Sequence, residues 1–358
     1  MTHPQGCLLL HFADEAAPAQ RLAQAAGLPL GTIERHRFPD GELKLRLPVD
    51  ASEAERELGV PERASQGAAG KAQSTAVARA TARICNDAGG GLGRQGGHDR
   101  FPLSLSGRLP PRAVLLRSLH DPNEKLVELL LAARAARSLG VQHLTLVAPY
   151  LAYMRQDIAF HPGEVVSQQV VGGFLAGLFD AVVTVDPHLH RIDRLEQAIP
   201  VPQAIVLSGA EPLADLIAQR RPGALLVGPD GESAQWIAQA AARHGFDHAV
   251  CTKVRHGDRD VAIELPPLDA HGRAVVLLDD MASTGRTLAL AARLLLQAGA
   301  ASVDVAVTHA LFAGDALQVL RDAGVGEVWS TDCIPHPSNA VPLAGPLAQA
   351  LRQCGVSA

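Results

Sequence analysis

Lysine is scarce in this chain, with 4 lysines against 28 arginines in 358 residues. Acidic residues outnumber basic ones, and the net charge of −5 argues against duplex nucleic acid as the main partner. No apolar run reaches the roughly 18 residues that a membrane span needs. The apolar stretch near the N-terminus is too short for a signal peptide. We therefore expect neither a nucleic-acid nor a membrane partner.

Cysteines are also few, and they are far apart in the sequence. Their number is odd and no C-x-x-C pair occurs, so the pattern predicts neither zinc ligation nor a disulfide framework. The five are Cys7, Cys85, Cys251, Cys333 and Cys354. Reduced cysteines are typical of cytosolic proteins, so we expect a cytoplasmic location.

Apolar runs alternate with helix-like stretches along most of the chain. Runs typical of buried strands occupy 7–12, 113–119, 143–150, 181–186, 204–209, 224–230, 273–280 and 302–312. Helical periodicity lies between many of them, at 18–27, 123–140, 167–178, 233–245 and 287–300. Strands that alternate with helices indicate βαβ units and a parallel sheet. The pattern runs twice, with a joint near 199–202, and predicts an α/β protein of two related domains.

One segment, residues 51–108, interrupts this alternation. It holds 10 of the 33 glycines and has little apolar periodicity. Such a composition buries too little surface to offset the entropy lost on ordering. We predict a disordered insertion, with a lid or a partner-binding arm as the alternative.

The most informative local pattern is AVVLLDDMASTGRTL, residues 274–288. An apolar strand delivers Asp279 and Asp280 to its carboxyl end, where ligands bind in open α/β sheets. The turn 283–287 then opens a helix, and its hydroxyls and backbone N–H groups suit a phosphate. The carboxylates of Asp279 and Asp280 beside this phosphate site can accept hydrogen bonds from a vicinal diol or ligate a Mg²⁺ ion. The pattern predicts a site for a pentose 5-phosphate, the alternative being a strand that ends at an ordinary helix cap.

This stretch resembles the ribose-phosphate-binding motif of phosphoribosyltransferase-type folds. Other segments occur in order around it: RFPDGELKLRLP (37–48), PYLAYMRQD (149–157), VDPH (185–188), VGPD (227–230), TKVR (252–255) and VTHALF (307–312). Together they resemble the ribose-phosphate pyrophosphokinase family over nearly the whole chain outside the insertion.

The resemblance implies two phosphoribosyltransferase-like domains, each a largely parallel sheet flanked by helices. The N-terminal domain would span 1–200 and carry the insertion 51–108. The C-terminal ribose-phosphate-binding domain would span 201–335, and residues 336–358 would pack back on the N-terminal domain. Family members are homo-oligomers built from dimers, hexamers among them, so we expect a homo-oligomer here.

The activity implied is ribose-phosphate diphosphokinase, in which Mg-ATP and ribose 5-phosphate give 5-phosphoribosyl 1-diphosphate and AMP. The residues that match ATP-binding positions are Phe38, Asp40 and Glu42, which reach across from a neighbouring subunit, and Arg155, Gln156 and Asp157. Lys253 and Arg255 match the catalytic pair on a flexible loop after a strand, and His188 and Asp230 match Mg²⁺ ligands, with His190 and His309 in support. The ribose 5-phosphate site comprises Asp279, Asp280, Ser283, Thr284, Gly285, Arg286 and Thr287.

Two positions depart from the family motif. Ser283 stands in place of a third aspartate, and its hydroxyl can still bind phosphate. Arg286 stands in place of a second glycine, where it either adds charge for phosphate binding or obstructs the site. A second hypothesis is a base phosphoribosyltransferase. Such an enzyme has no ATP site, so the segments that match ATP-binding positions argue against it. A third is a non-catalytic regulatory subunit that assembles with active synthetase subunits.

Overall fold

The computed structural model describes residues 6–49, 107–256, 260–267 and 269–356. The chain divides into two compact units, residues 1–48 together with 109–358, and residues 49–108. The insertion predicted at 51–108 lies outside the described residues except for its last two. The description below concerns the first unit.

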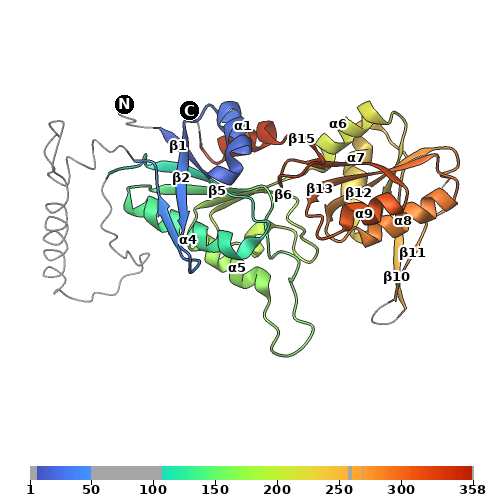
Figure 1. Cartoon of the computed structure of the whole chain (residues 1–358), viewed down its shortest axis with the longest axis horizontal. Helices are drawn as coiled ribbons and strands as arrows, with labels where there is room; N and C mark the ends of the chain where they lie inside the picture. The colour runs from blue at the N-terminus through green and yellow to red at the C-terminus, as the bar shows by residue number, and fades with distance from the viewer. Residues whose placement is uncertain (1–5, 50–106, 257–259, 268, 357–358) are drawn as a thin grey trace, which may run out of the picture. The chain divides into compact units, whose positions relative to one another are not determined.

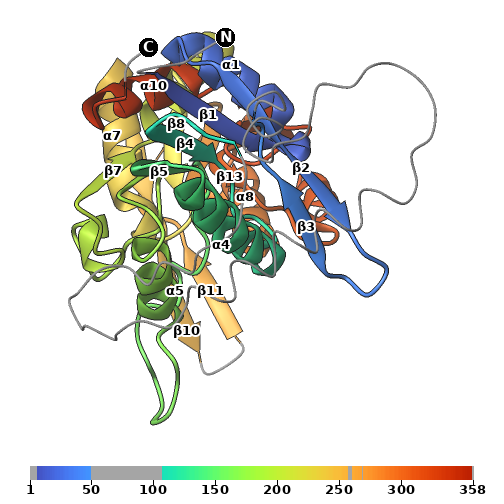
Figure 2. The same ribbon diagram turned by 90° about the vertical axis from the view of Figure 1, so that its left-hand side faces the viewer.

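The first sheet has seven strands in the order β3-β2-β1-β4-β5-β6-β7. Its neighbouring strands are parallel except β2 and β3, which form an antiparallel hairpin. The strands are β1 (Cys7–Phe12), β2 (Leu30–Arg37), β3 (Leu43–Arg46), β4 (Arg112–Leu116), β5 (His143–Ala148), β6 (Ala181–Val185) and β7 (Gln203–Leu207). Helices α1 (Ala16–Ala26) and α10 (Ala344–Gln353) pack together on one face, and α4 (Pro122–Ser138) and α5 (Ser167–Ala176) lie on the other (Figures 1 and 2).

The second sheet has six parallel strands in the order β15-β14-β13-β12-β8-β9. They are β8 (Leu225–Gly228), β9 (His248–Val250), β12 (Ala274–Ala282), β13 (Ser302–Ala310), β14 (Val325–Thr331) and β15 (Asn339–Val341). Helix α6 (Ala210–Arg220) packs against α7 (Ala234–His244), and α8 (Arg286–Gln297) against α9 (Ala316–Asp322). Strands β10 (Thr252–His256) and β11 (Asp260–Glu264) form a separate antiparallel ribbon. Short 3-10 turns lie at Ala13–Glu15 (η1), Leu195–Gln197 (η2) and Gly231–Ser233 (η3).

Helix α8 illustrates how the sequence pattern becomes structure. Its buried residues, Leu288, Ala289, Ala291, Ala292 and Leu295, recur at the spacing of one helical face. The chain leaves the helix through Gly299, whose φ of 90° suits glycine because a side chain would be strained there. The buried face packs on β12 and β13, which anchors the first turn of α8 at the carboxyl end of β12.

In each sheet, the direction in which successive strands are added reverses at one place in the strand order. In the first sheet the chain extends in opposite directions from neighbouring strands β1 and β4, and in the second from β8 and β12. Ligands in open α/β sheets bind at such switch points, at the carboxyl ends of the strands. The strand order therefore indicates one candidate ligand-binding edge on each sheet.

The switch point of the first sheet is filled by a buried ion cluster. Arg117, after β4, is only 1% exposed and forms ion pairs with Asp14, Glu15 and Glu128. Lys125 of α4 is also buried and donates to the carbonyl oxygen of Ser118 at 2.8 Å. Because buried charges are tolerated only when they are paired, the ion pairs of Arg117 with these three carboxylates allow it to be buried here.

The predicted fold class, α/β with two largely parallel sheets flanked by helices, is confirmed. The first sheet continues to Leu207, beyond the expected domain boundary at residue 200. Helix α10 packs on α1 and beside β6 and β7. Contacts group both sheets in one compact unit, so the predicted division into domains stays a prediction.

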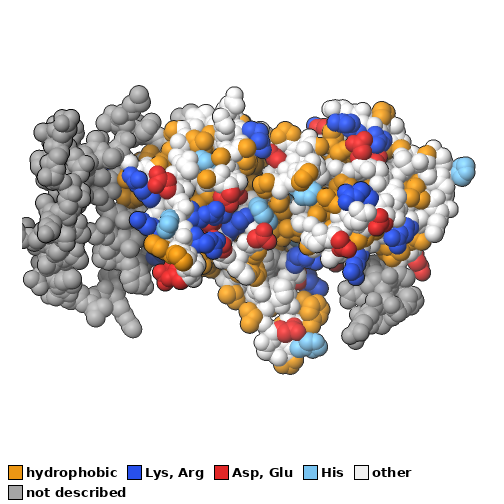
Figure 3. Space-filling model, viewed as in Figure 1, with side chains coloured by type: hydrophobic (Ala, Val, Ile, Leu, Met, Phe, Trp, Pro, Cys, Tyr) orange, Lys and Arg blue, Asp and Glu red, His pale blue; other side chains and the backbone are white. Residues whose placement is uncertain are grey.

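The surface carries charges of both signs. Lysine and arginine side chains are interspersed with aspartate and glutamate over the face seen in Figure 3. In the described part of the chain, no helix is long and apolar enough to cross a membrane. The four described cysteines, Cys7, Cys251, Cys333 and Cys354, are free and buried.

Candidate active site

Three carboxylates meet at the switch point of the second sheet. Asp230 follows β8 by two residues, and Asp279 and Asp280 are the sixth and seventh of the nine residues of β12. Burial raises the pKa of Asp279 well above its usual value, and the negative charges of Asp280 and Asp230 raise it further. A crowded set of carboxylate oxygens of this kind is chemically suited to a hard divalent cation or to hydroxyl donors.

The turn that follows β12 leads directly into α8. Gly285 has a φ of 70°, and a Cβ at this position would lie 3.2 Å from the carbonyl oxygen of Ala316. Thr284 and Arg286 are exposed, whereas Ser283 and Thr287 are half-buried. The N–H groups of the first helical turn have no partner within the helix, so this end of α8 is suited to an anion. The predicted residues 283–287 are thus brought together beside the carboxylates.

His188, from the first sheet, lies beside the carboxylates of the second sheet. It lies just after β6, and its Nδ1 is 2.5 Å from Oδ2 of Asp280. His188 and Asp186 both have positive φ, of 56° and 35°, although neither is glycine. Such left-handed residues are uncommon and strained, so the surrounding contacts must hold this turn in place.

Those contacts come from β13 and from the start of α6. Oδ2 of the buried Asp186 accepts hydrogen bonds from the hydroxyl of Thr308 at 2.7 Å and from the N–H of Gly209 at 2.9 Å. Nε2 of His309 lies 2.9 Å from the carbonyl oxygen of Val185. Burial raises the pKa of Asp186 and lowers that of His309. His309, a supporting candidate, therefore contacts the turn between the two sheets.

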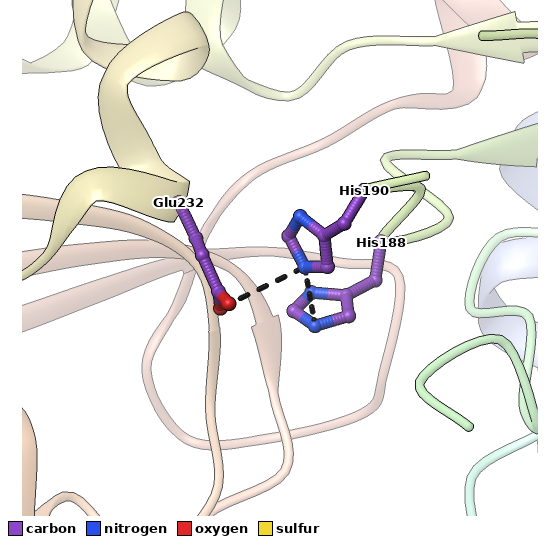
Figure 4. A group of neighbouring side chains, drawn as sticks. All are labelled: His188, His190 and Glu232. Atoms are coloured by element: carbon purple, nitrogen blue, oxygen red, sulfur yellow. Dashed lines mark hydrogen bonds and ion pairs between the residues drawn. The ribbon is translucent and has the colours of Figure 1, made fainter. Parts of the chain in front are cut away.

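Two further side chains lie beside His188. Nε2 of His190 is 2.7 Å from Nε2 of His188, and Oε2 of Glu232 is 3.8 Å from Nε2 of His190. Figure 4 shows both rings extending from the turn after β6 while Glu232 extends toward them from η3. Burial lowers the pKa of His190, and the neighbouring His188 lowers it further.

The predicted ATP segment, Arg155 to Asp157, lies in the long connection after β5. Asp157 pairs with Arg191 at 2.5 Å, which ties this segment to the turn that carries His188. Gln156 holds the start of α5, because its Oε1 accepts the N–H of Ser167. The positive charge of Arg155 lowers the pKa of Tyr150, whereas burial raises it more strongly.

The second predicted ATP segment forms the tip of the β2–β3 hairpin. The N–H of Phe38 donates to the carbonyl of Glu42, and Oδ1 of Asp40 accepts the N–H of Glu42. Phe38 is 40% exposed. The hairpin extends away from the rest of the first sheet (Figure 2) and is tied to α4, where Arg37 pairs with Glu124. This ion pair thus anchors the hairpin to α4.

Lys253 and Arg255 occupy β10, opposite Ile263 and Val261 of β11. The family resemblance predicted a flexible loop after a strand at this place. The structure shows an antiparallel ribbon here, after β9, which extends from the second sheet in Figures 1 and 2. The flexibility and the catalytic role stay predictions. Only the backbone of these two residues is described.

Two residues of the site were not predicted from the sequence. Asp186 holds the turn after β6, and Glu232 faces the histidines. Each follows the end of an apolar strand by a few residues, which is the one signal that could have marked it. Such a signal is weak, because acidic residues commonly occur where strands end.

Comparison with known proteins agrees with this geometry. Residues 111–177 match the N-terminal domain of ribose phosphate pyrophosphokinase, and residues 204–330 match the phosphoribosyl transferase domain. A ribose-phosphate pyrophosphokinase of Methanopyrus kandleri is 36% identical over 261 residues, which cover 71% of this chain and 88% of the relative. One from Methanosarcina mazei is 34% identical, with 71% and 85% covered.

The fold is similar to that of a solved phosphoribosylpyrophosphate synthetase from Mycobacterium smegmatis. The TM-score is 0.70 at 20% identity, and the match covers 98% of this chain and 99% of that one. The resemblance found in the sequence motifs is thus confirmed by identity above 30% over more than two thirds of the chain. This chain belongs to the ribose-phosphate pyrophosphokinase family.

Proposed function

We propose that this protein is a ribose-phosphate diphosphokinase. It transfers the diphosphoryl group of Mg-ATP to the C1 hydroxyl of ribose 5-phosphate and releases AMP. The observation that carries the proposal is the arrangement at β12, where Asp279 and Asp280 lie directly before a helix-opening turn at a topological switch point. Family membership points to the same reaction.

Ribose 5-phosphate binds along this segment. Its phosphate lies at the first turn of α8, where N–H groups and the hydroxyls of Ser283, Thr284 and Thr287 donate hydrogen bonds. Position 285 is occupied by glycine because its φ of 70° and the nearby carbonyl oxygen of Ala316 leave little room for a side chain. Without a side chain there, the phosphate can approach the backbone of the turn closely. The diol of the ribose donates to Asp279 and Asp280. Arg286 is exposed at the first position of α8 and adds positive charge for the phosphate.

ATP binds beside it. Arg155 pairs with its phosphates, Gln156 lines the adenine side, and Asp157 completes this ATP-binding segment. Phe38, Asp40 and Glu42 of a neighbouring subunit contact the adenine ring. The exposure of Phe38 at the tip of a projecting hairpin supports a contact outside its own subunit. The protein would accordingly be a dimer-based homo-oligomer. Its location would be the cytoplasm, as expected for reduced cysteines.

The donors at His188 and Asp230 fit a Mg²⁺ ion. The crowding that raises the pKa of Asp279 is the kind of repulsion that a divalent cation relieves, and the oxygens of Asp230 are the ligands that Mg²⁺ prefers. When bound, the ion supplies charge stabilisation for the ATP phosphates. His188 is held for this task by Asp280 at its other ring nitrogen.

Lys253 and Arg255 stabilise the transferring group. The C1 oxygen attacks the β-phosphorus, the bond between that phosphorus and the α,β-bridging oxygen breaks, and the hydroxyl proton passes to solvent. Negative charge grows on the phosphoryl oxygens, and cationic side chains aimed there lower the barrier. Positioning supplies the rest of the acceleration, so no strong base is required.

The decisive experiment incubates the purified full-length chain with Mg-ATP and ribose 5-phosphate. We expect AMP and 5-phosphoribosyl 1-diphosphate to form in equal amounts, and only when the sugar phosphate is present. A folded protein that forms no AMP would exclude the activity. Release of a free base from a nucleoside monophosphate by pyrophosphate, without use of ATP, would instead indicate a base phosphoribosyltransferase.

A further inference from the structure

We infer that Arg191 is a positioning residue for ATP and that it acts through Asp157. Nη1 of Arg191, in the connection after β6, donates a hydrogen bond to Oδ1 of Asp157 at 2.5 Å. Asp157 is the last residue of the segment 155–157 that the proposed function assigns to ATP. The inference therefore rests on that function and extends it to a residue outside the predicted site.

The burial of Asp157 indicates what its carboxylate does. The side chain is only 5% exposed, so little of it remains for contact with a ligand. A buried carboxylate is tolerated when it is paired, and Arg191 supplies the opposite charge. The side chain of Arg191 is itself 51% exposed, so it contributes the pair without being buried. Asp157 therefore holds the backbone of its own segment in place.

The preceding residue, Gln156, is fixed to a different element. Its Oε1 accepts the N–H of Ser167 at the start of α5 at 2.5 Å, and its Nε2 donates to the carbonyl oxygen of Ile158 at 3.0 Å. Two supports thus follow Arg155 directly in the chain. One is α5, reached through Gln156, and the other is the connection after β6, reached through Asp157.

Arg155 is the exposed member of the segment, and its position depends on these supports. The chain that follows the segment projects from the first sheet (Figures 1 and 2), and Ile158 and Phe160 are 38% and 74% exposed. The pair of Asp157 with Arg191 lies at the base of this projecting connection. A guanidinium that recognises phosphate oxygens needs a fixed orientation, because charge-assisted hydrogen bonds depend on geometry.

The connection that carries Arg191 is a firm support for the segment. At its start, the buried Asp186 accepts a hydrogen bond from the hydroxyl of Thr308 on β13 at 2.7 Å. His188 contacts Asp280 of β12. Both contacts tie this part of the chain to the strands that carry the proposed ribose 5-phosphate site. Arg191 therefore fixes the ATP segment relative to the sugar phosphate.

The test measures binding of the non-hydrolysable analogue α,β-methylene-ATP, with Mg²⁺, to the full-length protein by isothermal titration calorimetry. Arg191→Ala should weaken binding about 10-fold, the usual effect of losing a hydrogen bond between charged groups, and leave the affinity for ribose 5-phosphate unchanged. Arg191→Lys keeps the charge without the planar guanidinium and should recover part of the loss. Arg194→Ala is the matched control, because Arg194 is 72% exposed and pairs at 3.3 Å with the nearby Glu196. It should bind the analogue as the wild type does.

A double variant separates positioning from direct contact with ATP. Asp157→Asn should also weaken binding, and adding it to Arg191→Ala should weaken binding no further, because both remove the same pair. Losses that multiply would overturn the inference, since the two side chains would then act independently. It is also overturned if the wild type does not bind the analogue, if folded Arg191→Ala or Asp157→Asn binds as the wild type does, or if Arg194→Ala loses as much.

The proposed function and this inference fail in different ways. Binding of the analogue requires no turnover. A protein that binds the analogue but forms no AMP from Mg-ATP and ribose 5-phosphate would not be a diphosphokinase, whereas the expected losses in the variants would still support the role of Arg191.

Discussion

Single side chains on β12 and α4 are held in environments that oppose their charge. The carboxyl group of Asp279 lies beside two other carboxylates, and burial raises its pKa well above the usual value. Lys125 shows the reverse effect, since burial and then the charge of Arg117 lower its pKa to about 8. Both cases follow from the free energy needed to keep a charge away from water, and each predicts a measurable property.

The first prediction concerns stability and pH at Lys125. Its pKa is about 8 in the folded chain against 10.5 ordinarily, so the unfolded chain binds more protons between these values. The contribution of Lys125 to the free energy of unfolding should therefore rise as the pH increases from about 8 to 10.5. As the pH is lowered again through 8, this contribution should be lost. Relative to Lys125→Met, the wild type should gain about 1–2 kcal/mol from pH 7 to pH 10, allowing for solvent screening. Urea unfolding at both pH values measures the difference, and a constant difference would refute the assignment.

The second prediction concerns Lys253. If its charge acts on the transferring group, Lys253→Ala should lower kcat by about 10²–10³ while ribose 5-phosphate still binds. Lys253→Arg keeps the charge and should recover part of the loss. Steady-state kinetics and isothermal titration with the sugar phosphate separate the two effects. Loss of sugar-phosphate binding in Lys253→Ala would contradict the proposed role.

The third prediction concerns Arg286, which departs from the family motif. Because it is exposed at the first turn of α8, its removal should weaken attraction for the 5-phosphate without disturbing the fold. We expect Arg286→Ala to raise the KM for ribose 5-phosphate about 10-fold, the loss of one charge-assisted contact. Arg293→Ala, exposed farther along the same helix, is the control and should leave KM unchanged. A lower KM in Arg286→Ala would show that the side chain obstructs the site.

At the scale of elements, β12, its turn and α8 act as one unit. The strand is buried at its centre, and the helix packs its apolar face against β12 and β13. The carboxylates and the helix N-terminus are thereby held a few residues apart on rigid supports. Gly285 is the joint between them, and its conformation determines where the first turn of α8 points.

The fourth prediction tests that joint. Gly285→Ala places a Cβ at a φ of 70° and 3.2 Å from the carbonyl oxygen of Ala316. It should cost about 1–2 kcal/mol in the free energy of unfolding and raise the KM for ribose 5-phosphate. Gly272→Ala has the same φ with nothing within 4 Å, so it should cost less and leave KM unaltered. Equal effects of both substitutions in thermal unfolding and kinetics would rule out the close-packing argument.

At the scale of the whole unit, the two sheets meet at the candidate site. Asp186 bonds to Thr308, His309 contacts Val185, and His188 contacts Asp280, so each link joins the turn after β6 to the second sheet. One hydrophobic core also continues from β1 and β4 of the first sheet to α6, α7 and β12. The links are buried or half-buried, which makes their hydrogen bonds costly to lose.

The fifth prediction concerns this junction. Thr308→Val removes the hydroxyl that bonds to the buried carboxylate of Asp186 at 2.7 Å. It should destabilise the protein by about 1–3 kcal/mol and lower kcat, because the turn that carries His188 loses a support. Thr308→Ser retains the hydroxyl and should restore both properties. If Thr308→Val matches Thr308→Ser in urea unfolding and turnover, the junction does not depend on this bond.

Much of the fold could be predicted because apolar runs have strong periodicity. The strand expected at 7–12 forms over those residues, and those expected near 181–186 and 273–280 form within two residues of the expected ends. The hairpin of β2 and β3 and the ribbon of β10 and β11 were not predicted as such. Their residues alternate weakly between apolar and polar, so backbone pairing and not burial defines them.

The candidate site could be predicted in part for the same reason. Asp279, Asp280 and the turn 283–287 are contiguous, so local sequence carries the whole pattern. His188 and Asp230 were found through the family resemblance. Glu232 was not, because its proximity to His190 arises only when two separate strand ends meet.

The sequence by itself thus determined the alternation of strands and helices, the family and the order of the motifs, all of which depend on residues near one another in the chain. Only the tertiary structure decided which strand ends meet. Strand order places β8 beside β12, and hydrogen bonds from Asp186 to Thr308 and Gly209 set the turn after β6 against them. The grouping of His188, His190 and Glu232 depends on that packing, because residues far apart in sequence come together only through long-range contacts.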